Sequence, residues 1–293
     1  MNHNKISASD FADIMGVSKR TLMAWEQMGK YNIHRDDNGK SFLWIKDLLH
    51  VEAVKEMIES DWEKEMTTQP LRPYRSIELF AGAGGLALGM SKAGFRHVLL
   101  NELDKDACQT LMENKPEWHV AMGDVHRLSL KKYREQIDLL TGGFPCQAFS
   151  YAGKQGGFSD TRGTLFFELA RIVQEVQPKV LLCENVKGLQ SHDHGRTLSV
   201  IKNTIKEIGY TLVMPRVLQA IKYQVPQKRE RLMLVAIRND LAEGVVYRWP
   251  APYHRIMTLR DAFCKGELYD DDVPKSIGQQ YPEKKKKVLE LVP

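Results

Sequence analysis

The sequence is short of the features that mark secreted, disulfide-linked or membrane-spanning proteins. Only four of its 293 residues are cysteines, and no two of them form a C-x-x-C pair. Neither a disulfide framework nor a metal site is therefore indicated. No apolar run reaches the roughly 18 residues that cross a membrane, and residues 1–10 lack a signal-peptide pattern. We expect a cytoplasmic protein with no membrane partner and no metal.

Extremes of composition and charge are also missing. The chain is 43% hydrophobic, and 42 Lys and Arg against 37 Asp and Glu give a net charge of +5. These values are ordinary for a globular protein with one large α/β domain and a small appendage. The small positive excess permits a polyanionic partner such as nucleic acid but does not demonstrate one.

Residues 1–66 are predicted to form a small helical domain of the helix-turn-helix type. Two short helices are expected within 6–31, on either side of Gly16, with Ser18 as N-cap of the second. A third helix is expected at about 45–62, where apolar residues repeat at helical spacing. The sequence therefore predicts three helices in this domain.

Basic side chains lie on or beside the second of these expected helices. Lys19, Arg20 and Lys30 are suited to contacts with phosphates of a nucleic acid. The alternative is a small domain used for packing or for docking a partner. The sequence leaves both interpretations open.

Beyond a proline-containing linker at 67–73, short apolar runs alternate with helical stretches. Strands are expected at 77–80, 98–100, 137–140, 180–183, 212–217 and 232–237. Helices are expected at 86–92, 105–114, 165–175 and 198–208. This alternation predicts a catalytic α/β domain at 74–247 with a doubly wound, mostly parallel, Rossmann-like sheet. Residues 248–293 show no periodicity and form a C-terminal extension.

A glycine-rich turn, Phe80-Ala81-Gly82-Ala83-Gly84-Gly85, follows the first expected strand and opens a helix. Backbone amides at such a turn bind ligands. Ala87 stands where the dinucleotide pattern G-x-G-x-x-G needs its last glycine, which weakens a hydride-transfer interpretation. Glu102, after the second strand, could accept hydrogen bonds from a ribose, and Asp124, after the third, from an adenine amino group. Singly these could be plain turn residues, but together they predict an adenosine ligand.

Cys146 follows the strand at 137–140, in Gly143-Phe144-Pro145-Cys146-Gln147, at the carboxyl end where such sheets place their sites. A lone cysteine is usually an inert small hydrophobe. Here the flanking Gly and Pro residues and the glycine-rich segment that follows indicate a nucleophile beside a lid at 149–166. The loop residues expected to face DNA are Gln147, Ser150, Lys154 and Arg162.

Two further groups are predicted to converge on the cysteine loop. Glu184, in Glu184-Asn185-Val186, ends the strand at 180–183 and so shares the rim of Cys146. Arg229 and Arg231 alternate on entering the last strand, which places both guanidiniums on one face. That face suits a phosphate or a carbonyl oxygen. The structural alternatives are a carboxylate that caps a loop and a solvated strand edge.

Taken in order, these segments resemble the successive motifs of the DNA cytosine-5 methyltransferases, over about residues 74–240. The resemblance implies S-adenosylmethionine at the glycine turn and S-adenosylhomocysteine as product. The cofactor residues that it implies are Phe80, Gly82, Gly84, Gly85, Glu102, Leu103, Asp124, Val125, Gly143 and Pro145. Leu103 stands where the family often has a large aromatic residue.

The resemblance also implies roles in the methylation of double-stranded DNA within a restriction-modification system. Cys146 attacks carbon 6 of a flipped-out cytosine, and Glu184 binds the base. Arg229 or Arg231 fixes the carbonyl oxygen or the thiol loop. Asn185 holds the loop in register.

The chain departs from single-chain members after the strand at 232–237. It lacks a target-recognition domain and the closing Gln-Gly-Asn-Val-Pro type segment, since Ile277-Gly278-Gln279-Gln280 does not match it. We expect a second polypeptide to supply both, so that this chain alone has little activity; the alternative is that the sequence belongs to a longer one.

Two other functions compete with DNA methylation. One is a tRNA cytosine-5 methyltransferase of the same fold, against which the helix-turn-helix domain argues. The other is a catalytically silent DNA-binding regulator. The intact Cys146, Glu184 and Arg231 speak against the silent regulator.

Overall fold

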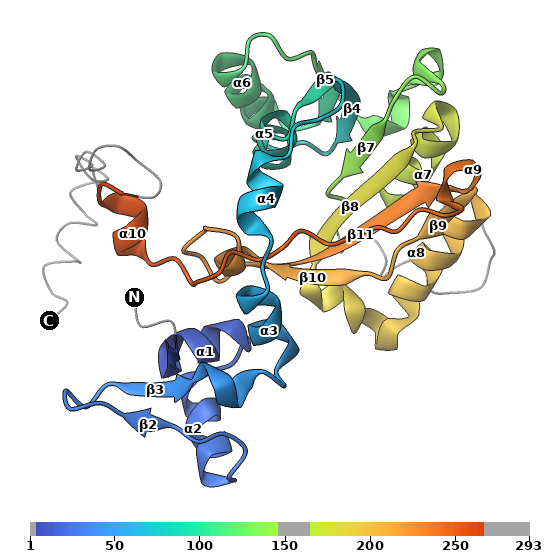
Figure 1. Cartoon of the computed structure of the whole chain (residues 1–293). Coiled ribbons are helices and arrows are strands. Elements are labelled where there is room, and N and C mark those ends of the chain that lie inside the picture. The colour runs from blue at the N-terminus through green and yellow to red at the C-terminus, as the bar shows by residue number, and fades with distance from the viewer. Residues whose placement is uncertain (1–3, 146–164, 267–293) are drawn as a thin grey trace, which may run out of the picture.

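The computed structural model describes residues 4–145 and 165–266 (Figure 1). A small N-terminal unit lies at one end, and an α/β unit is built around an eight-stranded sheet. The two units meet along β10 and the segment before α10.

The N-terminal unit contains the expected pair of short helices and a sheet that was not expected. Its elements are β1 (Lys5–Ser7), α1 (Ala8–Ile14), α2 (Lys19–Gln27), β2 (His34–Arg35), β3 (Ser41–Trp44), the 3-10 helix η1 (Ile45–Leu48), α3 (Glu52–Ile58) and α4 (Trp62–Thr67). Ser18 caps α2 as predicted, since its side chain accepts a hydrogen bond from the Thr21 amide at 3.0 Å. The strands form an antiparallel sheet in the order β1-β3-β2.

The single helix expected at about 45–62 is wrong. The chain breaks into η1, α3 and α4, with Val51 extended between the first two. At the second break the Ser60 hydroxyl donates to the carbonyl of Pro252. This contact with a residue distant in sequence lies where the helix ends, although the apolar residues of 45–62 continue at helical spacing.

The core of the N-terminal unit is completed by the α/β unit. Its buried residues include Phe11, Leu22 and Leu43, and they cluster with Ile221 and Ile256. Because two residues far along the chain belong to this cluster, residues 1–66 do not form a separate core.

The large sheet has the order β10-β11-β8-β7-β4-β5-β6, with β9 paired to β11. Its strands are β4 (Tyr74–Leu79), β5 (Phe95–Glu102), β6 (Val120–Met122), β7 (Leu139–Gly142), β8 (Val180–Val186), β9 (Tyr210–Leu212), β10 (Arg216–Gln219) and β11 (Glu230–Arg238). The strands from β4 to β8 are parallel, while β9 and β10 are antiparallel to β11. The mostly parallel sheet is confirmed. The one strand expected at 212–217 is wrong, because β9 and β10 pair with different parts of β11.

Helices cover the sheet and its core. They are α5 (Gly85–Lys92), α6 (Lys105–Asn114), α7 (Leu165–Val176) and α8 (Arg196–Glu207), with the short α9 (Asn239–Ala242) and α10 (Leu259–Phe263) near the end of the described chain. The main core packs strand residues such as Leu140 and Leu181 against Leu169 of α7 and Ile201 of α8. The strand order reverses between β4 and β7, which are adjacent in the sheet. Ligands bind at the carboxyl ends of the strands beside such a reversal.

Candidate active site

The glycine turn leaves β4 in a conformation that favours glycine. Phe80, Gly82 and Gly84 have φ angles of 59°, 55° and 86°. Gly84 is the N-cap of α5, and a Cβ atom there would lie 2.5 Å from Cδ2 of Leu111. The turn therefore approaches α6 more closely than a side chain allows, and it opens a helix as predicted.

Glu102, at the end of β5, is bound to this turn. Its Oε2 accepts from the Gly82 amide at 2.7 Å, and its Oε1 accepts from the amides of Leu103 and Asp104 at 2.8 and 2.9 Å. A carboxylate has about four lone-pair directions, so one is left for a ligand. Glu102 thus fixes the turn and still has capacity for a ribose hydroxyl.

The residues expected around adenine differ in exposure. Leu103 is 67% exposed, so its side chain is available for packing on a flat ring. Val125 is 4% exposed and packs in the main core, so a ligand would meet its backbone rather than its side chain.

The Asp124 carboxylate is held in one direction by its neighbour. Its Oδ1 accepts from the His126 amide at 3.0 Å and contacts Nδ1 of the same residue at 2.7 Å. These hydrogen bonds lower the pKa of Asp124. The carboxylate is therefore an oriented acceptor that lies just after the carboxyl end of β6.

β7 delivers the segment that leads to the predicted nucleophile. Phe144 is buried and packs against Phe166 of α7, with ring centroids 5.1 Å apart. Its carbonyl accepts from Nδ2 of the buried Asn185 at 2.9 Å. Asn185 therefore ties the chain to β8 two residues before Cys146. Five predicted residues lie outside the described residues: Cys146, Gln147, Ser150, Lys154 and Arg162.

Glu184 and the two arginines converge, as the strand pattern predicted. β8 and β11 are antiparallel, and Nε of Arg231 lies 2.5 Å from Oε1 of Glu184. A guanidinium nitrogen of Arg229 lies 3.9 Å from the same oxygen. The other oxygen of Glu184 would lie 3.4 Å from a Cβ on Gly143. The carboxylate therefore stands between the cysteine loop and two cations, with 29% of its side chain exposed.

The remaining cysteines are poor nucleophiles or lie elsewhere. Burial raises the pKa of Cys183 to about 12, and burial is also the main cause of the raised pKa of Cys108. Neither thiol would supply a thiolate near neutral pH. Cys264 is exposed just after α10.

Sequence reasoning missed Glu78, which lies within β4. It is 2% exposed, its carboxylate accepts from the Thr141 hydroxyl at 3.3 Å, and it also bonds the Ala87 amide. Burial raises its pKa to about 7. Glu78 thus joins the first turn of α5 to β7, the strand that leads to Cys146. An acidic residue inside an apolar strand was the available signal.

Sequence reasoning also missed a contact on the reverse face of the arginine strand. Lys228 forms an ion pair with Asp13 of α1. A Cβ on Gly16 would lie 3.0 Å from Nε2 of Gln219 and 3.5 Å from Oε1 of Glu230. The turn after α1 therefore packs where β10 and β11 pair, on the side opposite Glu184.

Metal-binding clusters and membrane-spanning helices do not occur in the part of the chain that the structure describes. Within 4–145 and 165–266, no group of three or more His, Cys, Asp or Glu side chains is placed to hold a metal ion. Over those same ranges, no helix is long and apolar enough to cross a membrane.

A glycine turn at the strand-order reversal, with Glu102 at the end of β5 and Asp124 just after β6, is typical of an α/β domain that binds an adenosine-containing ligand. A solved structure indicates the S-adenosylmethionine-dependent methyltransferase class. The fold is similar to that of a protein described as a DNA modification methyltransferase encoded within an E. coli prophage, with a TM-score of 0.53 and 26% identity over 67% of this chain and 56% of that one.

Residues 74–288 match the family model of the C-5 cytosine-specific DNA methylases. The chain is 55% identical to Type II methyltransferase M.Eco47II of Escherichia coli, over 100% of this chain and 70% of that protein. It is 50% identical to M.PspPI of Psychrobacter sp. (strain TA137), over 99% and 70%, and 44% identical to M.HhaI of Haemophilus parahaemolyticus, over 67% and 59%. The chain belongs to the C-5 cytosine-specific DNA methylase family.

Membership confirms the predicted reaction class. The family transfers a methyl group from S-adenosylmethionine to carbon 5 of cytosine in DNA, and the relatives are Type II enzymes of restriction-modification systems. DNA, rather than tRNA, is therefore the substrate, and the chain is an enzyme rather than a silent regulator.

Proposed function

We propose that the rim formed by β4, β7 and β8 methylates cytosine through a covalent adduct at Cys146. The observation that carries this proposal is the Glu184 carboxylate, held by Arg231 at 2.5 Å and lying against Gly143 of the cysteine loop. A base seated there would meet an acid, a cation and the loop that bears the thiol. A target in a stacked duplex cannot reach such a site, so the cytosine must be flipped out.

The cofactor pocket fits S-adenosylmethionine in its donor chemistry. The turn at 82–85 would lie against the ligand at the start of α5, with its Gly82 and Gly84 amides held by Glu102 and the Ala81 carbonyl, and Gly84 leaves no room for a side chain. Glu102 would bind the ribose, Asp124 the adenine amino group, and Leu103 would cover the ring. The bound cofactor supplies an electrophilic methyl group.

The protein's own residues activate the base. The Cys146 thiolate donates its electron pair to carbon 6, and the carbon 5–carbon 6 π pair then becomes available at carbon 5 for the new bond to methyl. Glu184 binds ring nitrogen 3 and the amino group, and Arg231 or Arg229 binds the carbonyl oxygen. After methyl transfer a proton acceptor removes the carbon 5 proton. The electron pair of that C–H bond restores the carbon 5–carbon 6 double bond and expels the Cys146 thiolate.

Trapping tests this mechanism directly. With S-adenosylmethionine and any completing polypeptide present, duplex DNA with 5-fluorocytosine at the target should form a denaturation-resistant adduct, because after methyl transfer carbon 5 carries no proton to lose. We expect the adduct on a Cys146 peptide by mass spectrometry, none with Cys146→Ser, and a normal yield with Cys264→Ser. An adduct that survives Cys146→Ser would overturn the nucleophile assignment.

We also propose that a second polypeptide supplies target recognition and the closing motifs, and that the enzyme works in the cytoplasm, where its DNA substrate lies. The chain spans 70% of the length of M.Eco47II. In the trapping assay, adduct formation at full rate by this chain alone would contradict the second polypeptide.

The N-terminal unit is proposed to bind duplex DNA through α2. Lys19 and Arg20 are exposed at its first turn, whereas the ammonium of Lys30 lies 4.2 Å from the ring centre of Trp25. Two phosphate-contacting cations at a helix start are typical of helix-turn-helix docking. Packing onto the catalytic unit is the competing role, which the core shared with Ile221 and Ile256 supports.

Substitution separates these roles better than deletion, because deleting 1–66 would uncover Ile221 and Ile256. Lys19→Ala with Arg20→Ala should weaken binding to nonspecific duplex about tenfold. The slope of log K against log salt should become shallower by about 2, because each cation that binds a phosphate contributes about one to that slope. Fluorescence anisotropy at several salt concentrations measures both. The exposed Lys46, outside α2, provides the control Lys46→Ala; equal slopes for all three proteins would refute DNA contact by α2.

A further inference from the structure

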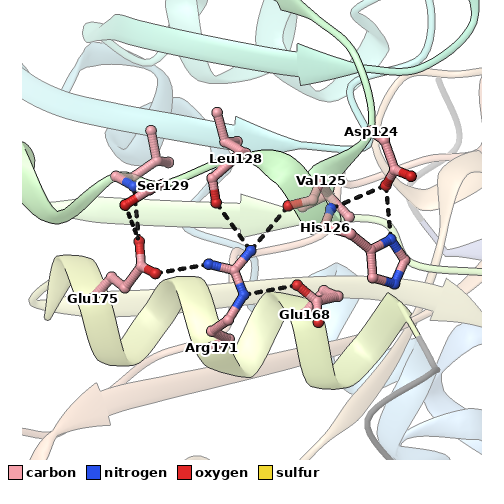
Figure 2. Close-up of polar contacts among 9 residues, drawn as sticks. Asp124, Val125, His126, Leu128, Ser129, Glu168, Arg171 and Glu175 are labelled. Atoms are coloured by element: carbon pink, nitrogen blue, oxygen red, sulfur yellow. Dashed lines mark hydrogen bonds and ion pairs between the residues drawn. The ribbon is translucent and has the colours of Figure 1, made fainter.

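Arg171, in the middle of α7, lies against the loop that joins β6 to β7 (Figure 2). Its Nη2 donates to the carbonyl of Val125 at 2.9 Å and to that of Leu128 at 3.0 Å. One guanidinium nitrogen thus bridges the two ends of the 3-10 turn η2 (Val125–Arg127). The loop follows Asp124 directly.

The rest of the guanidinium is held by two carboxylates of the same helix. Nε donates to Glu168 at 2.7 Å, and Nη1 donates to Glu175 at 2.7 Å, each carboxylate being only 12% exposed. The other oxygen of Glu175 accepts from the Leu130 amide at 2.8 Å and from the Ser129 hydroxyl at 3.3 Å. A planar fork of donors is suited to such a network, whereas a lysine is a single point charge.

These contacts fix the loop on both sides of the turn. Arg171 holds Val125 and Leu128, at the two ends of η2, and Glu175 holds Ser129 and Leu130, which follow the turn. Asp124 is oriented at the same place by His126, which is part of the turn (Figure 2). Arg171 does not touch Asp124; it acts through the backbone one residue away.

We propose that Arg171 is a positioning residue that gives the cofactor site its selectivity for the adenine amino group. The proposal rests on the assignment of Asp124 to that amino group under the proposed function. A carboxylate discriminates between a hydrogen-bond donor and an acceptor only if it is held in line with it, because a misaligned hydrogen bond weakens steeply. Arg171 and Glu175 supply that alignment from α7.

The test compares two product analogues by calorimetry. One is S-adenosylhomocysteine, and the other is S-inosylhomocysteine, which has an oxygen where adenine carries its amino group. We expect the unaltered chain to prefer the adenine compound by about tenfold or more, since a hydrogen bond to a charged group contributes about 1.5–3 kcal/mol. Arg171→Met keeps the stem and removes the fork, and should reduce the preference to about threefold or less.

Two more variants make the result decisive. Glu175→Gln keeps the volume and leaves Arg171 in place, and should lower the preference by a smaller factor; it carries the test if Arg171→Met does not fold. Arg134→Met, which removes a contact to the Gln174 carbonyl and a 3.9 Å ion pair with Glu135, should keep the full preference. Thermal unfolding monitors stability in each case.

The outcomes separate the two proposals. No preference in the unaltered chain would overturn the Asp124 assignment. A preference that is present there and unchanged in folded Arg171→Met and Glu175→Gln would overturn the positioning role alone.

Discussion

Replacing Glu184 with glutamine is expected to lower kcat for cytosine methylation about 10²–10³-fold, the cost of removing one electrostatic group from a preorganised site. Glutamine has the same size and would still lie beside Gly143. It would lose the ion pair with Arg231 at 2.5 Å and would present a neutral amide to the base. The affinity for S-adenosylhomocysteine should change little, because the glycine turn lies at β4.

Single-turnover methyl transfer to duplex DNA, with any completing polypeptide in excess, gives the rate. A matched control lies at the far end of β11, the strand of Arg231, where Arg238 pairs with Asp240 at 2.7 Å. Asp240→Asn also breaks an arginine–carboxylate pair but should leave the rate within about twofold, since surface pairs contribute little. If Glu184→Gln were no slower than Asp240→Asn, the carboxylate would have no part in the chemistry.

Replacing Gly84 with alanine is expected to lower the free energy of unfolding by about 2–5 kcal/mol. The left-handed backbone costs alanine about 1–2 kcal/mol, and forcing a Cβ to within 2.5 Å of the Leu111 side chain adds about 1–3. Leu111 is 2% exposed, so it has little room to move. Cofactor affinity should fall as well, because the turn would shift.

Two other glycines separate the causes. Gly82 also has a positive φ but open space around its Cβ position, so Gly82→Ala should cost only the backbone strain. Gly89 is inside α5 with open space and no positive φ, so Gly89→Ala should stabilise by about 0.5–1 kcal/mol. Urea unfolding measures all three. Equal losses for Gly84→Ala and Gly82→Ala would show that the contact with Leu111 costs nothing.

The sequence predicted those parts of the structure that repeat or alternate. Parallel strands appeared as apolar runs, and Glu184, Arg229 and Arg231 could be placed on one rim because strand ends and alternation are regular. The strands β1 to β3 have two to four residues, too few to show a period. The breaks around α3 and α4 depend on residues nearly two hundred positions away.

Other features of the site depended on pairs that no local pattern reveals. Arg171 is one of several charged residues on an amphipathic helix, and only the fold brings it to the Val125 carbonyl. Glu78 showed its burial in the sequence, but not its bonds to Thr141 and Ala87.

The segment 228–231 contacts a different part of the molecule with each of its two faces. Lys228 and Glu230 meet the turn after α1, while Arg229 and Arg231 meet Glu184. Exchange of N-terminal units between relatives should therefore succeed only when this segment travels with them. M.Eco47II, which aligns with the whole chain, is a suitable partner for such an exchange. Residues 1–66 and the segment 228–231 should therefore be exchanged together, as one structural unit.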